Sequence, residues 1–356
     1  MAQQHLDPTD PAAGAVTGDT LAGYLRAQAT EFLRALRLHR ETGGSSNGTE
    51  ESVDAARALR RSARRISGSL HTFRPLLDTA WSEEIRPELA WLSGTLGLEH
   101  SYEARLERLL LALHRLSGSS AVPAQTVGAA VGGPTDGAAP APLKATPPNG
   151  NLTVGAAKAG ALLDRQLTLA RTRAHSTALQ ALGSSRFHAV ADKVAVLASE
   201  VPLTATATST DLLPMADAAE ERLTDAITAL PLVTAGHPYN AEALIHGLSP
   251  DPSSHPQDGP WHQVRLLLRL YRYAREVLLG RGAPVDLRLL TAGQALNRHR
   301  DASEAASAAA QAARTPRIAP ATAYALGVLH ADQRHEVEAS RFAFQQCWQK
   351  QTVTTP

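Results

Sequence analysis

The sequence predicts an all-α protein made of two pseudo-symmetric antiparallel helical bundles, and three observations lead to this class. Alanine, leucine and arginine recur throughout the 356 residues, whereas aromatic residues make up only 4%. Straight-chain side chains lose little rotamer freedom in a helix, so this composition favours helices over strands. Apolar residues recur at steps of three or four, and an arginine-rich helical segment occurs twice, which indicates an internal duplication.

The first predicted helix begins near Thr20, where apolar residues first recur at helical spacing. Its apolar stripe runs from Leu21 to Leu36, and Asp19 or Thr20 can cap its first turn. The segment TGGSSNGTEES then breaks the pattern and predicts a loop. The helices predicted for this part of the chain cover residues 20–41, 53–73, 82–96 and 99–117.

A segment rich in Gly, Pro, Ala and Ser, residues 118–154, interrupts the helical pattern. It has almost no large apolar residue, so burial cannot offset the entropy of ordering it, and a flexible insertion is predicted. A later loop, HGLSPDPSSHPQDGP, leads into the helical segment WHQVRLLLRLYRYARE. The remaining predicted helices cover residues 155–182, 185–199, 210–230, 261–280, 286–297, 300–314, 320–332 and 334–349.

Two arginine-rich segments of the chain resemble each other. Residues 53–65 read VDAARALRRSARR and residues 261–273 read WHQVRLLLRLYRY. We therefore predict a flexible N-terminus over 1–18, a first half over 19–205 and a second half over 206–352, related by a pseudo-twofold axis. At a shift of 208 positions, the aligned pairs are Arg57 with Arg265, Arg61 with Arg269, Arg64 with Arg272, Asp54 with His262, and Arg65 with Tyr273.

The arginines of each segment project from one side of their helix. At 100° per residue, Arg57, Arg61 and Arg64 fall within about a third of the circumference, with Arg65 beside them and Arg60 at the edge. The second segment places its aligned residues in the same way. The opposite sides carry apolar residues that suit a core, namely Leu59, Ala63 and Ile66 on the first helix and Leu266, Leu267, Leu270 and Val277 on the second.

This arrangement of charge predicts an anion-binding face. Five like charges on one helix face repel one another, and residues 53–76 offer only Asp54 to offset them. Arginine presents a planar fork of donors that fits phosphate or carboxylate oxygens, and it stays protonated at working pH. A row with one turn between members suits an anion that repeats, such as a phosphate chain.

Each of these residues also has an ordinary structural interpretation. An arginine-rich helix face is most often a solvated surface, although two copies with the same spacing favour binding. His262 is as often a capping or packing histidine as a ligand. Tyr273 is of a type that usually belongs to the core, and its hydroxyl could also donate to a phosphate oxygen.

Charge and cysteine content limit the classes of function. The formal net charge is only +1, so a basic site must arise from local clustering. Cys347 is the one cysteine, which excludes an internal disulfide and a cysteine-based metal cluster. The N-terminus lacks a basic segment followed by an apolar one, and no run of about 18 apolar residues occurs. We therefore expect no secretory signal, no membrane partner and a cytoplasmic location.

Several segments together resemble the CHAD family, the conserved histidine α-helical domain. Its leucine-glycine element resembles LGLEHS at 96–101 and LNRHRD at 296–301, and its closing segment resembles residues 325–348. The resemblance covers roughly residues 20–350. The family's main pattern is matched by His262, Arg265, Arg269, Arg272, Tyr273 and Glu276.

The resemblance implies two pseudo-symmetric bundles around a basic central cleft or channel that binds inorganic polyphosphate, with a location at polyphosphate granules. Two departures, Asp54 at the place of the first-half histidine and His100-Ser101 at the place of Arg-Asp, imply weakened or asymmetric binding. From the rows and the resemblance together, the predicted polyphosphate-binding residues are Arg57, Arg61, Arg64, Arg65, His262, Arg265, Arg269, Arg272, Tyr273 and Arg300.

No motif in the sequence indicates an enzyme. We find no phosphate-binding glycine loop, GxGxxG, HExxH or GxSxG, so we expect a non-catalytic protein without cofactor or metal. Two alternatives stay open: a phosphohydrolase-type enzyme that uses His262 as acid or base, and a basic helical module that binds nucleic acid or a protein partner.

Overall fold

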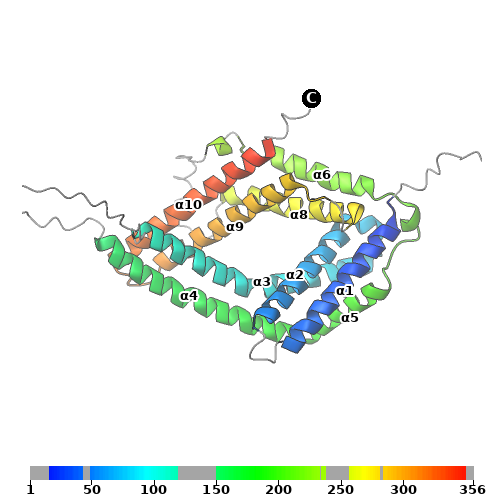
Figure 1. Ribbon diagram of the computed structural model, residues 1–356, viewed down its shortest axis with the longest axis horizontal. Helices are drawn as coiled ribbons and strands as arrows, with labels where there is room; N and C mark the ends of the chain where they lie inside the picture. The colour runs from blue at the N-terminus through cyan, green and yellow to red at the C-terminus, as the bar shows by residue number, and fades with distance from the viewer. Residues whose placement is uncertain are drawn as a thin grey trace, which may run out of the picture.

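The computed structural model describes residues 16–42, 49–118, 150–232, 234–237, 256–280 and 284–349. Within these ranges the chain forms nine α-helices and a few short 3-10 turns, with no strand beyond one isolated bridge between Leu77 and Leu203. The all-α class is therefore confirmed for the described residues (Figure 1). The helices are α1 (Gly18–Thr42), α2 (Thr49–Thr72), α3 (Thr79–Leu116), α4 (Gly150–Leu182), α5 (Ser185–Ser199), α6 (Leu213–Thr228), α8 (Gly259–Leu279), α9 (Leu287–Ala313) and α10 (Pro320–Gln349).

Three helices are longer than the sequence predicts. The predicted breaks near residues 97, 298 and 333 do not occur, because α3, α9 and α10 run through them without interruption. Packing against neighbouring helices overrides the weak local signals that suggested those breaks. The predicted flexible insertion, residues 118–154, falls mainly on residues 119–149, and the predicted flexible N-terminus mainly on residues 1–15, both outside the described residues. The predicted end of the insertion is wrong, because residues 150–154 already belong to α4.

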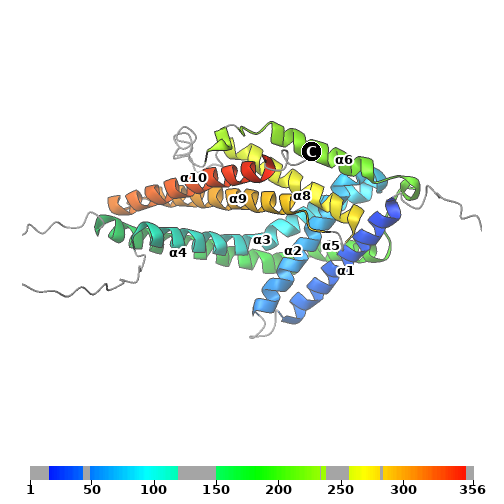
Figure 2. The same cartoon turned by 45° about the horizontal axis from the view of Figure 1, so that its top comes forward.

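The helices pack as neighbouring pairs. Helix α1 lies along α2 and α5, α3 lies along α4, α9 lies along α10, and α6 lies along α8. The long α3–α4 and α9–α10 pairs meet at one end, through contacts of α10 with α4, and diverge toward the other end in Figure 1, while Figure 2 shows the α9–α10 pair above the α3–α4 pair. The α2 and α8 helices, which carry the two arginine-rich segments, also contact each other. This contact brings residues separated by about two hundred positions into one region.

Three hydrophobic clusters hold these pairs together. The first cluster joins α1, α2 and α5. The second joins the C-terminal ends of α3 and α9 to the N-terminal halves of α4 and α10. The third joins α6 and α8 to the N-terminal part of α9 and the C-terminal part of α10. The first also includes Ala274 and Val277 of α8, so this core crosses the predicted boundary at residue 205. The two halves and their duplication stay predictions.

The predicted core face of α2 is confirmed, and that of α8 only in part. Leu59, Ala63 and Ile66 have no exposed surface and Val277 is buried, whereas Leu267 and Leu270 are only partly buried. The prediction for Leu266 is wrong, because this side chain is 51% exposed. Leu266 leaves α8 about 200° around the helix from the buried Leu268, so it lies on the opposite side of the helix and turns toward solvent.

Glycine 68 permits the close approach of α2 and α8. A Cβ atom at this position would lie 2.6 Å from Cδ2 of Tyr273 and 3.3 Å from a methyl group of Leu270. Such distances leave no room for a larger residue unless the tyrosine ring moves. Because Gly68 has no side chain, α2 and α8 can pack closely, and this close packing brings their arginines together.

A buried network of ionised groups anchors the start of α8, and we call it the Asp258 network. The Asp258 carboxylate is fully buried and accepts hydrogen bonds from Arg334 Nη1 at 2.7 Å, Arg341 Nη2 at 2.6 Å and Ser303 Oγ at 2.5 Å. His299 lies beside it and accepts from Arg341 Nε at 3.3 Å. The network ties the start of α8 to α9 and α10, and Arg334 is a buried residue of the core.

The network predicts a loss of stability in mild acid. Burial, followed by the charge of Arg341, lowers the pKa of His299 to about 3, whereas an unfolded histidine titrates near 6.5. Between these values the unfolded chain binds a proton that the folded protein does not, so stability falls as the pH falls below about 6.5. At about 1.4 kcal/mol per pH unit, His299 alone removes roughly 2 kcal/mol between pH 7 and pH 5.

Urea denaturation at pH 7 and pH 5 measures this loss. The H299Q variant keeps an acceptor for Arg341 but cannot titrate, so its stability should depend much less on pH over the same interval. Equal pH dependence in H299Q and the unchanged protein would contradict the assignment. Below about pH 4 a further loss is expected from Asp258, because the hydrogen bond from Arg334 holds its pKa below the usual value although burial opposes this.

Candidate anion-binding site

The first turns of α8 are held by their apolar face. Pro260 occupies the first turn, where its missing N–H costs nothing, and the Trp261 indole packs edge-on against Phe344 and stacks on His299. Val264 and Leu268 continue this buried face. Arg265 and Arg269 each follow a buried residue, so they leave α8 about 100° around the helix from Val264 and Leu268, on the side of α2 and α9.

Four arginines from two helices form the centre of the candidate site. We call Arg60 and Arg64 of α2 with Arg265 and Arg269 of α8 the arginine cluster. Among the described residues, none of the four has a carboxylate oxygen within 4.0 Å. The four guanidinium groups lie close enough for their charges to lower one another's pKa. This holds for the pairs Arg60–Arg64, Arg265–Arg269 and Arg64–Arg269.

Burial, followed by repulsion between neighbouring guanidinium groups, lowers the pKa values in the arginine cluster. Burial, followed by the charges of Arg64 and Arg300, lowers the pKa of Arg60 to about 10. Burial, followed by the charges of Arg269 and Arg300, lowers the pKa of Arg265 to about 9. All these guanidinium groups are still protonated at neutral pH, so the repulsion is present in the folded protein.

Three members of the arginine cluster, Arg60, Arg64 and Arg265, line a cavity of about 380 Å³ between α2, α3, α8 and α9, which we call the arginine pocket, while Arg269 lies beside it. The lining includes six arginines but only two carboxylates, and Arg108 also pairs with Glu336 outside the lining, which leaves three positive charges uncompensated. An anion in this cavity would meet guanidinium groups from four helices. The charged lining residues are Arg60, Arg64, Arg105, Arg108, Arg265 and Arg300 with Asp301 and Glu304.

The carboxylates of the pocket are taken by arginines outside the arginine cluster. Arg105 Nη2 donates to Glu304 at 2.5 Å, and Arg300 Nε donates to its neighbour Asp301 at 2.9 Å. Within the cluster, Arg265 Nε donates to the neutral Asn297 amide oxygen at 2.7 Å. The buried Nε atoms of Arg60 and Arg64 have no hydrogen-bond partner among the described residues. Buried donors without partners are costly, and oxygens of an oxyanion would satisfy them.

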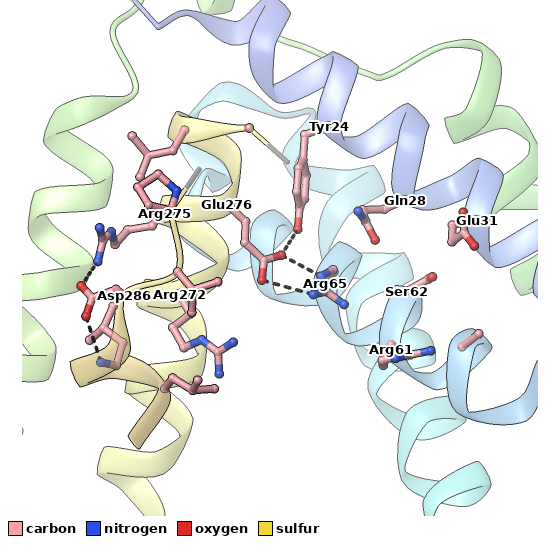
Figure 3. Close-up of a pocket in the computed structure, with 17 residues that line it drawn as sticks. Tyr24, Gln28, Glu31, Arg61, Ser62, Arg65, Arg272, Arg275, Glu276 and Asp286 are labelled. Atoms are coloured by element: carbon pink, nitrogen blue, oxygen red, sulfur yellow. Dashed lines mark hydrogen bonds and ion pairs between the residues drawn. The ribbon is translucent and has the colours of Figure 1, made fainter. Parts of the chain in front are cut away.

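The remaining predicted arginines of the two rows lie elsewhere. Arg61, Arg65 and Arg272 line a different cavity, on the side of α2 that faces α1 (Figure 3). Arg60 and Arg61 are adjacent in sequence, so their side chains leave α2 about 100° apart. One central cleft lined by both complete rows is therefore not shown.

Two further predicted residues, Arg57 and Tyr273, do not line the arginine pocket, and a third, Arg300, does. Arg57 is exposed and pairs with Asp54 at 3.1 Å. The Tyr273 ring packs against Gly68, with the Arg65 guanidinium 5.7 Å from its centre. Arg300 lies in the pocket, as the family resemblance implied.

His262 is half-buried one turn before Arg265. Its ring meets the ring of His299 edge-on at 5.4 Å between centroids, and its buried Nε2 has no partner among the described residues. Burial lowers its pKa, the charge of Asp258 opposes this, and the charge of Arg265 adds to it. His262 is thus mainly neutral at pH 7 and provides little positive charge for an anion.

Sequence reasoning missed two basic residues of α3 and undervalued one of α2. Arg105 and Arg108 line the pocket although no row was recognised around them, and Arg60, placed only at the edge of its face, lies at the centre. Arg105 and Arg108 are three residues apart on one helix, so their shared face was a readable signal. What it faces depends on how α3 packs against α9, which spacing cannot give.

The described residues offer neither a membrane-spanning helix nor a cluster of metal ligands. No described helix has the length and apolar content to cross a membrane. The described residues also contain no group of three or more His, Cys, Asp or Glu side chains arranged to hold a metal ion.

Fold and site together define an all-α protein that gathers unpaired arginines from distant helices around one pocket. The sequence model of the CHAD domain matches residues 27–310, so the chain belongs to the CHAD domain family. The chain is similar to the solved structure of PptA from Streptomyces chartreusis, with 71% identity, 94% of this chain and 100% of that chain covered, and a TM-score of 0.76.

A second solved structure, the CHAD domain from the plant Ricinus communis, matches with 16% identity. The match covers 95% of this chain and 94% of the plant chain, with a TM-score of 0.46. No curated protein matches the sequence.

Proposed function

We propose that this protein binds inorganic polyphosphate in the arginine pocket without changing it chemically. The observation that carries the proposal is the arginine cluster, whose four members lie close together, are partly buried and have no carboxylate partner among the described residues. Membership of the CHAD family supports polyphosphate as the ligand, because the resemblance to this family implies polyphosphate binding. A protein with this property would be found where polyphosphate accumulates in the cytoplasm.

The shape of the ligand follows from how the charges are distributed. Arg60 and Arg64 are one turn apart on α2, and Arg265 and Arg269 are one turn apart on α8, about 6 Å along each helix axis. An anion that carries one charge per phosphate unit can meet several of these groups at once. Each guanidinium can donate two parallel hydrogen bonds to phosphate oxygens, and bound charge removes the repulsion within the arginine cluster.

Affinity that depends on several phosphate contacts must weaken steeply with salt. By analogy with single-stranded nucleic acids, four contacts predict a slope of roughly −3 for log K against log salt concentration. Binding of polyphosphate of defined length, measured by filter binding or calorimetry across about 50–300 mM salt, gives this slope. Absence of binding at the lowest salt, or a slope near zero, would overturn the proposal.

The same assay separates the two alternative functions. Double-stranded DNA at matched charge should compete poorly, because a pocket of about 380 Å³ admits a thin chain but not a duplex. Equal competition would favour a nucleic-acid module. Release of phosphate from polyphosphate, lost in H262A, would favour the enzyme, for which the buried, unpartnered Nε2 of His262 beside Arg265 is the motivating feature.

A further inference from the structure

A larger cavity lies apart from the arginine pocket. It has a volume of about 600 Å³, and its walls are α1, α2, the end of α8 and the start of α9 (Figure 3). None of its lining residues lines the arginine pocket. We call it the amphipathic pocket, because its wall combines charged side chains with a continuous apolar part.

The apolar part of the wall comes from the α8–α9 end of the pocket. Leu279, Val285, Leu289 and Leu290 line it, and the first two are 53% and 69% exposed. Large apolar side chains that line a cavity and remain open to water favour a ligand with apolar surface. Inorganic polyphosphate has no such surface, so it would leave this wall uncovered.

Most charges of the amphipathic pocket are already paired. Arg65 Nε donates to Glu276 at 2.7 Å, and the Tyr24 hydroxyl donates to the same carboxylate at 3.1 Å (Figure 3). This pairing raises the pKa of Arg65, although burial opposes the rise. Arg275 pairs with Asp286 across the pocket. These linked pairs hold the wall of the pocket in one arrangement.

Two arginines of the amphipathic pocket are left without a carboxylate. Among the described residues, neither Arg61 of α2 nor Arg272 of α8 has a carboxylate oxygen within ion-pair distance, and the nearby Glu31 is paired with Arg34 at 2.7 Å. Figure 3 shows Arg61 and Arg272 on either side of the Arg65–Glu276 pair. The pocket therefore offers two free guanidinium groups from two helices and, beside them, an apolar wall.

We propose that the amphipathic pocket is a second anion site, which binds a small phosphate monoester with an apolar body. The phosphate lies between Arg61 and Arg272, and the body lies against the wall that includes Val285 and Leu290. A volume of about 600 Å³ is in the range of sites for small organic ligands. Two guanidinium groups match the double charge of a phosphate monoester near neutral pH.

The probe that tests this site is 1-naphthyl phosphate, compared with its two halves, inorganic phosphate and 1-naphthol. If charge and apolar wall act together, calorimetry should show the ester binding at least about tenfold more tightly than either half. An ester that binds no more tightly than inorganic phosphate would overturn the inference.

Variants locate the binding. R61Q/R272Q should weaken the ester by about tenfold or more, and V285S by about threefold, since it removes part of the apolar wall. Both changed regions are at least partly exposed, so the variants should fold, which circular dichroism checks. V285S should leave polyphosphate binding unchanged.

Parallel titration with polyphosphate keeps this inference separate from the proposed function. R265A/R269A should bind the ester within about twofold of the unchanged protein, since no member of the arginine cluster lines this pocket. If R61Q/R272Q weakens polyphosphate but not the ester, the amphipathic pocket belongs to polyphosphate, and this inference fails while the proposed function stands. If the ester binds as expected and polyphosphate does not bind, only the proposed function fails.

Discussion

The double variant R265A/R269A is expected to bind polyphosphate about a hundredfold more weakly than the unchanged protein at low salt. Each arginine contact to phosphate is a charge-assisted hydrogen bond, which contributes about 1.5–3 kcal/mol where water is partly excluded. Two lost contacts therefore remove at least about 3 kcal/mol, or two powers of ten in affinity. Filter binding at fixed chain length measures the change.

The matched control removes the same charge from another surface. R34A/R37A takes two arginines from the exposed face of α1, where they pair with Glu31 and Glu41. Because these side chains lie outside both pockets, affinity should change by less than about threefold. Equal losses in the two double variants would mean that net charge alone, and not the arginine cluster, determines binding.

The variant D258A is expected to lose about 3–5 kcal/mol of unfolding free energy. It removes the carboxylate that Arg334 and Arg341 share, and both arginines are nearly fully buried. Removing one partner of a buried ion pair leaves uncompensated charge in the interior, which is far more costly than the net value of the pair. Ser303 also loses its acceptor. Urea denaturation at pH 7 measures the change in stability.

An exposed pair provides the comparison for D258A. Asp54 and Arg57 lie 3.1 Å apart on the surface, so D54A should change stability by less than about 1 kcal/mol. D258N keeps the size of the side chain and one acceptor, and it should be intermediate. A D258A protein as stable as D54A would show that the buried network contributes little. Since Asp258 immediately precedes α8, its loss also disturbs the helix that carries Arg265.

The helices could largely be predicted from sequence, and their lengths could not. Leucine spacing located α1, α2 and α8 to within a few residues, because each buries a continuous apolar face. The sequence predicts a break at residues 97–98, yet α3 continues through it. A Cβ atom at Gly97 would lie 2.5 Å from Cζ of Arg60, so this glycine makes room for an arginine from another helix. Such a reason for a glycine appears only in the folded chain.

The candidate site was predicted in part for a related reason. Arginine spacing identified Arg64, Arg265 and Arg269, because side chains one turn apart must share a face. Spacing did not divide the arginines between two pockets. That division follows from the contact of α2 with α8 at Gly68 and from carboxylates such as Glu276, which comes from the other helix and neutralises Arg65.

The Asp258 network could not be foreseen from local sequence. Asp258 lies in a segment rich in Gly, Pro and Asp that predicts a loop, and its partner Arg334 is 76 positions away. Arg334 and Arg341 are seven residues apart on α10, one face of a helix, and that repeat was a usable signal. Two arginines on one helix face are equally consistent with an exposed binding surface and with a buried ion pair, unless the carboxylate that they contact is known.

The structure of the protein with bound polyphosphate tests the central claim most directly. We predict phosphate groups inside the arginine pocket, with their oxygens within hydrogen-bond distance of Arg60, Arg64 and Arg265. A polyphosphate chain bound on another surface, with these three guanidinium groups still without an anion, would contradict it.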